Sequence, residues 1–171
     1  KLAGLADEIV REGGEAIVLP TDVTREDEVL TLFQETERRA GRLDLLVNNA
    51  GIADATPTDE LELARWREII DVNLTSAFLC SREAIRLMKR AGGGRIINIG
   101  SLSAKSPRPH SVAYTASKFA VEGLTRSIAL DGREHNITAS ALHPGQTLSS
   151  LVPGVTDQLG SDRIEPAALG R

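Results

Sequence analysis

Cysteine is almost absent from this sequence, since Cys80 is the only one among 171 residues. A single cysteine can form no disulfide within the chain and supplies no cluster of ligands for zinc. A surplus of positive charge is also lacking, because the formal net charge is -4, and such a chain offers nucleic-acid phosphates no attractive field. No apolar stretch approaches the roughly 18 residues that a membrane span needs, and residues 1–4 show no secretory pattern. These absences predict a cytoplasmic protein without a metal site that binds neither membranes nor nucleic acids.

Apolar residues, by contrast, are plentiful at 41% of the chain, and charged residues make up 26%. This composition excludes a disordered chain, and the length corresponds to about one domain with a substantial core. No repeat, low-complexity tract or linker divides the sequence. We therefore predict a single domain over residues 1–171.

Short apolar runs alternate with longer stretches of helical periodicity, which is typical of an α/β domain with a parallel sheet. We predict buried strands at 16–20, 43–47, 95–100 and 137–142. Helices are predicted at 1–12, from a capping box at Thr24 and Asp27 to about residue 40, at 63–90 and at 112–133. Beyond Pro144 the sequence is polar and loop-like.

Small or polar residues follow every predicted strand. In open parallel sheets, ligands bind outside the carboxyl ends of the strands. The residues at these four positions are Asp22 and Val23, Asn48 to Gly51, Ser101, and Pro144 with Gly145. Such residues also begin ordinary loops, which would explain any one position, but the four together favour a ligand crevice.

Tyr114 and Lys118 lie four residues apart at the start of a predicted helix and therefore share one helix face. A phenol is a poor base at neutral pH because it titrates near 10, but a nearby ammonium and the positive end of a helix both favour the phenolate. Ser111 is a candidate N-cap, which would place Tyr114 in the first turn. An exposed tyrosine beside a solvated lysine is the simpler interpretation of the bare pair. However, Tyr114 is the only tyrosine and Lys118 one of four lysines.

Asn73 interrupts the apolar stripe of the long predicted helix, which comprises Trp66, Ile69, Ile70, Leu74, Ala77 and Phe78. A buried amide costs roughly 1–3 kcal/mol unless its hydrogen bonds are satisfied. Asn73 could be a structural residue bonded to neighbouring backbone, or it could hold a water or bend the helix at an active site. We expect it to be buried near Lys118 or Ser101, on a locally irregular helix.

In order and spacing, these residues resemble the classical short-chain dehydrogenase/reductase family. The resemblance covers the chain from Asp22 to Pro144 at least and rests on Asn48-Asn49-Ala50-Gly51, Asn73, Ser101, Tyr114-Thr115-Ala116-Ser117-Lys118 and Pro144-Gly145. It implies a Rossmann-like, doubly wound parallel sheet. It also implies NAD or NADP as the cofactor, without deciding between them, and a small-molecule alcohol or ketone as the substrate.

The resemblance implies a role for each matching residue. Tyr114 would be the general acid/base, Lys118 would favour its phenolate and bind the nicotinamide ribose, and Ser101 would orient the substrate oxygen. Asn73 would hold a water that links Lys118 to solvent as a proton relay. The implied cofactor contacts, besides Tyr114 and Lys118, are Asp22 and Val23 at the adenine, Asn49, Ala50 and Gly51 along the cofactor, and Pro144, Gly145 and Thr147 at the nicotinamide.

The family's glycine-rich phosphate turn and its second strand have no counterpart in this sequence. Gly4 and Gly13-Gly14 flank a predicted helix in the wrong way to cradle a pyrophosphate. We therefore expect the sheet to be incomplete at both ends as given, with about 40 or more residues before Lys1 in the physical protein. Residues 16–20 and 43–47 would then be roughly 14 Å apart and unpaired, because two strands belong between them.

The leading hypothesis is an NAD(P)(H)-dependent oxidoreductase that interconverts a secondary alcohol and a ketone. Within this class, alternatives are a 3-oxoacyl-thioester (acyl-carrier-protein) reductase and a steroid or sugar alcohol dehydrogenase. The alternative from another class is a relic of the fold that has a binding or structural role and no turnover.

Two structural predictions accompany this hypothesis. The hydroxyls of Ser101 and Tyr114 should converge on one open space, with Lys118 on the same side of Tyr114. A homodimer or homotetramer is expected through helices 63–90 and 112–133, because these carry apolar residues in more than one sector, including Phe119 and Leu124.

Overall fold

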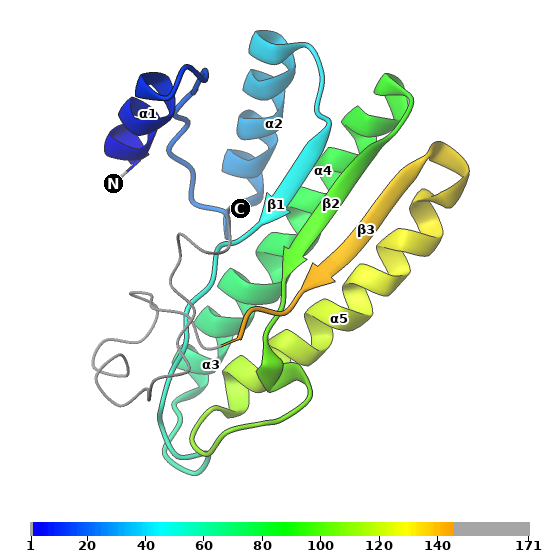
Figure 1. Cartoon of the computed structure of the whole chain (residues 1–171). Helices are drawn as coiled ribbons and strands as arrows, with labels where there is room; N and C mark the ends of the chain where they lie inside the picture. Colours follow the sequence, from blue (N-terminus) through cyan, green and yellow to red (C-terminus); the bar gives the residue numbers. More distant parts are fainter. Residues whose placement is uncertain (1, 146–171) are drawn as a thin grey trace.

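Three parallel strands form the sheet in the order β1 (Leu45–Asn48), β2 (Gly94–Ile99) and β3 (Ile137–Leu142). The structure, a computed structural model, describes residues 2–145. Leu45 of β1 pairs with Arg95 of β2, and Gly94 of β2 pairs with Ile137 of β3. The carboxyl ends of the strands therefore lie along one edge of the sheet (Figure 1). The predicted parallel α/β sheet is confirmed.

The α-helices of the described chain are α1 (Leu2–Arg11), α2 (Glu26–Ala40), α3 (Leu63–Ile70), α4 (Ser76–Ala91) and α5 (Val112–Gly132). A π-helical turn, Asp71–Thr75, joins α3 to α4, and 3₁₀ turns follow β2 and α5 at Leu102–Ala104 and Arg133–His135. Between residues 2 and 145, no helix is both long and apolar enough to cross a membrane.

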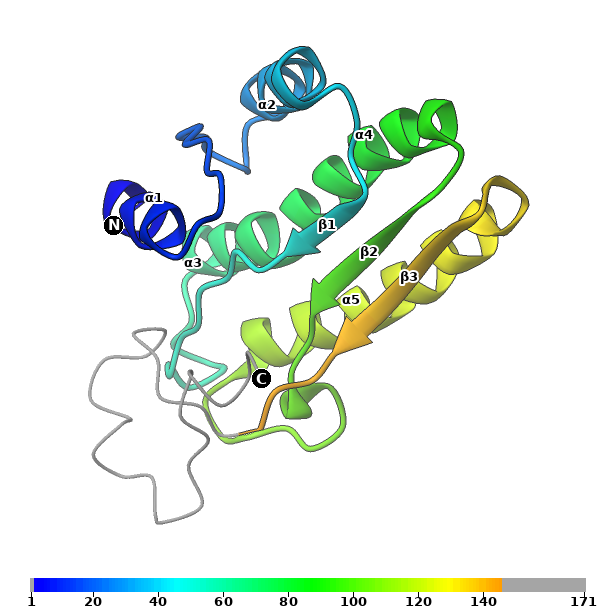
Figure 2. The same cartoon turned by 45° about the horizontal axis from the view of Figure 1, so that its top comes forward.

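Helices α4 and α5 pack on one face of the sheet, and α2 lies against α4 (Figures 1 and 2). The core forms between them because the apolar stripes of α2 and α4 meet the inward side chains of the strands. Its buried members are Val29, Phe33, Leu79, Cys80, Ala84, Leu87, Met88, Ile96, Ile128 and Ile137. On β1 the outward side chains of Leu45 and Val47 are exposed, so the expectation of a fully buried strand there is wrong. The sheet is covered at this point on one face only.

Residues 16–20 do not form the predicted strand, and Ile17 is 53% exposed. Their apolar character indicated a strand, but a strand needs a neighbour to pair with its backbone groups. Within residues 2–145, β1 pairs with β2 and not with residues 16–20. The expected lack of pairing between 16–20 and 43–47 is thus confirmed, while the strand itself is corrected.

The predicted capping box at Thr24 and Asp27 is also wrong. The residue that precedes α2 is Arg25. The amide and hydroxyl of Thr24 donate instead to the carboxylate of Asp22, at 3.0 and 2.7 Å. Asp22 is a charged acceptor close by in sequence, and it holds Thr24 in a turn ahead of the helix.

Candidate active site

The loops that carry the predicted site leave the sheet at the carboxyl ends of all three strands. β1 leads into Asn49, Ala50 and Gly51, β2 leads into Ser101, and β3 leads toward Pro144. Helix α5 begins at the same edge, so its first two turns place Tyr114 and Lys118 beside these loops (Figure 1). The topology therefore gathers residues from four separate parts of the sequence.

Lys118 is 5% exposed although it carries an ammonium group. Its Nζ donates a hydrogen bond of 2.7 Å to the backbone carbonyl of Ile99, the last residue of β2. Burial lowers the pKa of Lys118 from 10.5 to about 8, because the charged form loses its hydration. The bond to Ile99 anchors the first part of α5 to the end of β2.

Tyr114 lies one helical turn before Lys118, and the Nζ atom is 5.7 Å from the centroid of its ring. The phenol is half-buried. The predicted placement of Lys118 on the same side of Tyr114 is in accord with this contact. A cation at this range is attracted to the face of the aromatic ring.

Ser101 follows β2 and begins the 3₁₀ turn Leu102–Ala104. Its Oγ accepts a hydrogen bond of 3.1 Å from the amide of Ser103, which fixes the side chain at the mouth of the loop. The backbone carbonyl of Ser101 contacts Nδ1 of His143 at 3.0 Å. The convergence of the Ser101 and Tyr114 hydroxyls stays a prediction.

Asn73 is 2% exposed and lies within the π-helical turn, so the predicted burial and helix irregularity are confirmed. Its Oδ1 accepts from the amide of Ile52 at 2.8 Å. Its Nδ2 donates to the carbonyl of Ile52 at 2.9 Å and to Oγ of Ser117 at 3.0 Å. Both N–H bonds of the amide are thus used by protein groups, and only the second lone pair of Oδ1 is left for a water.

Asn73 also lies near Lys118, as predicted, with Gly51 between them. A Cβ placed on Gly51 would be 3.4 Å from Oδ1 of Asn73 and 3.8 Å from Nζ of Lys118. Both atoms thus border the space where a side chain of residue 51 would start. A small polar molecule beside Gly51, in the space that these two atoms face, would contact an acceptor and a donor at once.

The two predicted adenine contacts lie on the turn before α2. Asp22 is exposed, and its hydrogen bonds from Thr24 hold the pKa of its carboxyl below the usual value. Val23 lines a cavity of about 150 Å³ together with Asn49, Ala50 and Asn73. Val23 is therefore brought together with the loop after β1, whereas the Asp22 carboxylate is already occupied by its own turn.

Pro144 and Gly145 follow β3 after His143 and are half-buried. Because the last residue of β3 pairs with the last residue of β2 and His143 contacts the carbonyl of Ser101, they lie at the edge that also carries Ser101, as predicted. Thr147 lies outside the described residues.

A buried network of polar side chains lies beneath these loops. Nδ2 of Asn48 donates to Oδ1 of Asn98 at 2.7 Å and to Oγ of Ser81 at 3.0 Å. Nδ2 of Asn98 donates to Oγ1 of Thr125 at 2.8 Å. This network links β1, β2, α4 and α5 just below the points where the site loops begin.

Sequence reasoning missed several residues that shape this site. Ser117 is fully buried between Asn73 and the carbonyl of Tyr114, to which its Oγ donates at 2.7 Å. Its position in the quoted Tyr114–Lys118 motif, on the helix face beside Lys118, was the available signal. Asp54 and Arg65, which pair at 2.8 Å, gave no such signal, because Asp54 belongs to a loop and Arg65 to the half-buried side of α3.

Comparison with known proteins agrees with this arrangement. The family model for short chain dehydrogenases matches residues 1–160, and the chain belongs to the short-chain dehydrogenase family. It is 39% identical over 160 residues to a 3beta-hydroxysteroid dehydrogenase of Mediterraneibacter gnavus, covering 93% of this chain and 58% of that protein. It is 39% identical over 157 residues to a 3-oxoacyl-[acyl-carrier-protein] reductase of Synechocystis, covering 92% of this chain and 62% of that protein.

Solved structures give the same result. A gluconate 5-dehydrogenase from Burkholderia cenocepacia, in complex with NADP and tartrate, superposes with a TM-score of 0.86 at 35% identity and covers 91% of this chain and 61% of its own. A short-chain type dehydrogenase/reductase from Mycobacterium marinum superposes with a TM-score of 0.87 at 33% identity, covering 91% and 63%. The Rossmann-like fold is confirmed. The chain spans about three fifths of the length of these relatives.

Proposed function

We propose that the protein is an NAD(P)(H)-dependent oxidoreductase that interconverts a secondary alcohol and a ketone, with Tyr114 as the general acid/base. The observation that carries the proposal is the buried ammonium of Lys118, held 5.7 Å from the ring of Tyr114 at the carboxyl edge of a parallel sheet. This edge is where such sheets bind ligands. A tyrosine that acts as general acid/base there would accept a proton from an alcohol or donate one to a ketone.

The residues present fit the nicotinamide ribose end of such a cofactor. An ammonium has three N–H donors, and within the described chain Lys118 gives one of them to Ile99. The others are available to ribose hydroxyls, and Gly51 leaves the approach without a side chain. We assign the adenine contact to Val23 and Asp22 and the nicotinamide contact to Pro144 and Gly145. When bound, the cofactor supplies the ring that accepts or donates the hydride.

Ser101 and Asn73 complete the proposed machinery. The Ser103 amide fixes Oγ of Ser101, so its O–H proton is available to orient a substrate oxygen beside Tyr114. We propose that a water between Oδ1 of Asn73 and Nζ of Lys118 relays the proton toward solvent. The shared border of these two atoms at Gly51 supports this role.

The relatives narrow the class of substrate, since they include a hydroxysteroid dehydrogenase and a 3-oxoacyl-[acyl-carrier-protein] reductase. Both act at a carbon that carries a hydroxyl or an oxo group, as the proposed reaction does. The second candidate is therefore reduction of a 3-oxoacyl thioester. Assays of the full-length protein with a hydroxysteroid, a polyol and a 3-oxoacyl thioester would distinguish these candidate substrates.

The test of the function is the change in absorbance of the reduced nicotinamide, with NAD(H) and NADP(H) compared in parallel. Tyr114→Phe should lower turnover by about a thousandfold, and Ser101→Ala by about a hundredfold, because positioned proton transfer and orientation contribute such factors. Cofactor binding by the Tyr114→Phe variant should stay close to that of the wild type. Full activity in this variant would exclude the assignment, and cofactor binding without turnover in the wild type would favour the relic.

We further propose that α4 and α5 form an interface between copies of the chain. Phe78 of α4 and Phe119 of α5 are 47% and 48% exposed, and burial in an assembly would remove this apolar surface from water. The cytoplasmic location remains the expectation from composition, and fractionation of cells that produce the full-length protein would test it.

A further inference from the structure

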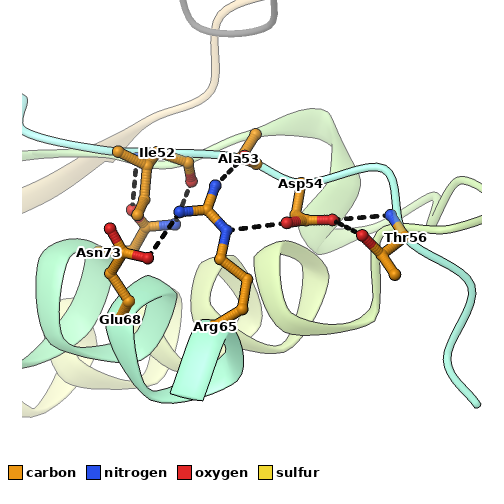
Figure 3. Close-up of polar contacts among 7 residues, drawn as sticks. All are labelled: Ile52, Ala53, Asp54, Thr56, Arg65, Glu68 and Asn73. Atoms are coloured by element: carbon orange, nitrogen blue, oxygen red, sulfur yellow. Dashed lines mark hydrogen bonds and ion pairs between the residues drawn. The ribbon is translucent and has the colours of Figure 1, made fainter. Parts of the chain in front are cut away.

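The segment Ile52–Asp54 follows Gly51 without joining a strand. Its backbone is held instead by side chains from α3 and the π-helical turn (Figure 3). At one end, the side-chain amide of Asn73 bonds to both the N–H and the C=O of Ile52. This pair of bonds replaces the two that a neighbouring strand would provide.

Arg65 holds the other end of the segment. Its Nε donates to Oδ2 of Asp54 at 2.8 Å, and one terminal nitrogen donates to the carbonyl of Ala53 at 2.9 Å. The second terminal nitrogen donates to Glu68, one turn further along α3, at 2.7 Å. The planar guanidinium fork therefore joins two successive residues of the segment to the helix (Figure 3).

Asp54 is also fixed from its own loop, by hydrogen bonds from Thr56. Its Oδ1 accepts from the amide of Thr56 at 2.7 Å and from the Thr56 hydroxyl. Its side chain is 16% exposed, and the bonds from Thr56 and then Arg65 hold the pKa of the carboxyl below its usual range. The carboxylate thus bridges the loop and α3 as a charged acceptor near neutral pH.

The position of this segment determines the position of Gly51, to which it is directly joined. Gly51 borders both Asn73 and Lys118. Tyr114 and Ser101, in contrast, lie on α5 and after β2, and within the described residues the hydrogen bonds of Arg65 go to Asp54, Ala53 and Glu68 instead. A displacement of the segment would alter the wall of the binding site and leave Tyr114 and Ser101 in place, while Asn73 would keep its bond to Ser117 of α5.

We propose that Arg65, acting through Asp54 and Ala53, is a positioning residue that fixes the loop after Gly51 as a wall of the cofactor and substrate site. This inference rests on the proposed function. Arg65 touches no reacting atom. It sets binding, whereas Tyr114, Lys118 and Ser101 set the chemical step.

The kinetic experiment compares Arg65→Gln and Asp54→Asn with Glu68→Gln in the full-length protein. The control removes an exposed ion pair of the same arginine without touching the segment. We expect KM for cofactor and substrate to rise roughly tenfold in the first two variants while kcat stays within about threefold, which is the signature of lost binding rather than lost chemistry. The KM values of Arg65→Lys should lie between those of the wild type and those of Arg65→Gln, because a single ammonium cannot reproduce the two-nitrogen fork of the guanidinium.

A merely structural role would lower the amount of folded enzyme, so kcat would fall and KM would not change. That result, or equal KM values in Arg65→Gln and Glu68→Gln, would overturn the proposal.

Hydrogen exchange provides a readout that does not depend on turnover. The amide of Ile52 donates to Asn73, and the amide of Thr56 donates to the carboxylate of Asp54 that Arg65 also holds. Their exchange should accelerate at least about fivefold in Arg65→Gln and stay within about twofold of wild type in Glu68→Gln, because local opening becomes easier only in the former. Unchanged exchange in Arg65→Gln would overturn the proposal that Arg65 fixes this loop. A wild-type protein without turnover would overturn the proposed function alone, and the exchange comparison would still decide whether Arg65 holds the segment.

Discussion

Lys118 brings a positive charge into the interior, where its Nζ donates a hydrogen bond to the backbone carbonyl of Ile99. Its environment therefore favours the neutral amine more than water does, which is why its pKa falls to about 8. The charge that serves the site is held at the expense of folding stability. This opposition is typical of functional residues.

The pH dependence of stability should reveal this opposition. Below about pH 8 both folded and unfolded chains carry the Lys118 proton, and burial destabilises the fold. Between about pH 8 and 10.5 only the unfolded chain retains it, so stability rises with pH in this window. The rise should be on the order of 3 kcal/mol and should be absent from Lys118→Met in urea unfolding series. Parallel curves for the two proteins would contradict it.

A second prediction at the residue scale concerns Gly51. A methyl group there makes only ordinary contacts, at 3.4 Å from Asn73 and 3.8 Å from Lys118, so Gly51→Ala should fold normally. It would nevertheless narrow the space beside Gly51 in which the proposed relay water lies, and kcat should fall roughly tenfold. Gly123→Ala is the matched control, because a Cβ on that helical glycine meets no atom within 4 Å. Unchanged kcat in Gly51→Ala would exclude the relay at this point.

At the scale of elements, the polar network under the loops holds strands and helices in register. Asn98 is fully buried and connects Asn48 of β1 with Thr125 of α5. Removal of the Asn98 side chain therefore takes an acceptor from the amide of Asn48 and a donor from the hydroxyl of Thr125.

Asn98→Ala should therefore lower the free energy of unfolding by about 3 kcal/mol, and Thr125→Val by about 1 kcal/mol, because the valine leaves no cavity and deprives Asn98 of a single acceptor. Equilibrium unfolding in urea measures both values. A smaller loss for Asn98→Ala than for Thr125→Val would show that the network does not join the elements.

Local patterns predicted the elements where those patterns decide the outcome. The strand at 137–142 and the end of α2 at Gly41 follow from apolar alternation and from a glycine with φ of 76°. Asn73 was found because a polar residue inside an apolar stripe needs partners. Residues 16–20 failed, since a strand also depends on a neighbour that local sequence does not describe. The ion pair of Arg65 with Asp54 could not be predicted either, because it joins a helix to a loop and hydrophobic periodicity carries no information about such pairs.

At the scale of the whole molecule, one face of the sheet and the outer sides of α4 and α5 carry exposed apolar residues, including Leu45, Phe78 and Phe119. Scattered apolar residues are normal on protein surfaces, but aromatic residues on two neighbouring helices favour an interface.

The assembly prediction follows from this surface. Light scattering of the full-length protein should give a mass of two or four chains. Phe119→Glu should shift the mass toward one chain, because a charge placed in an apolar interface is left unpaired. Leu2→Gln, on the exposed face of α1 and outside the proposed interface, should leave the mass unchanged. A wild-type mass of one chain would contradict the prediction.

The contact between Gly100 and His143 limits how the sequence can vary. A Cβ on Gly100 would lie 2.7 Å from the imidazole ring of His143, a distance at which one of the two must give way. A side chain at position 100 therefore requires either a displaced imidazole ring or a smaller residue at position 143. The two positions should therefore covary among relatives, with glycine at position 100 wherever histidine stands at position 143, although 43 residues separate them. Such covariation would reveal the contact between the residues that follow β2 and β3, which hydrophobic periodicity does not predict.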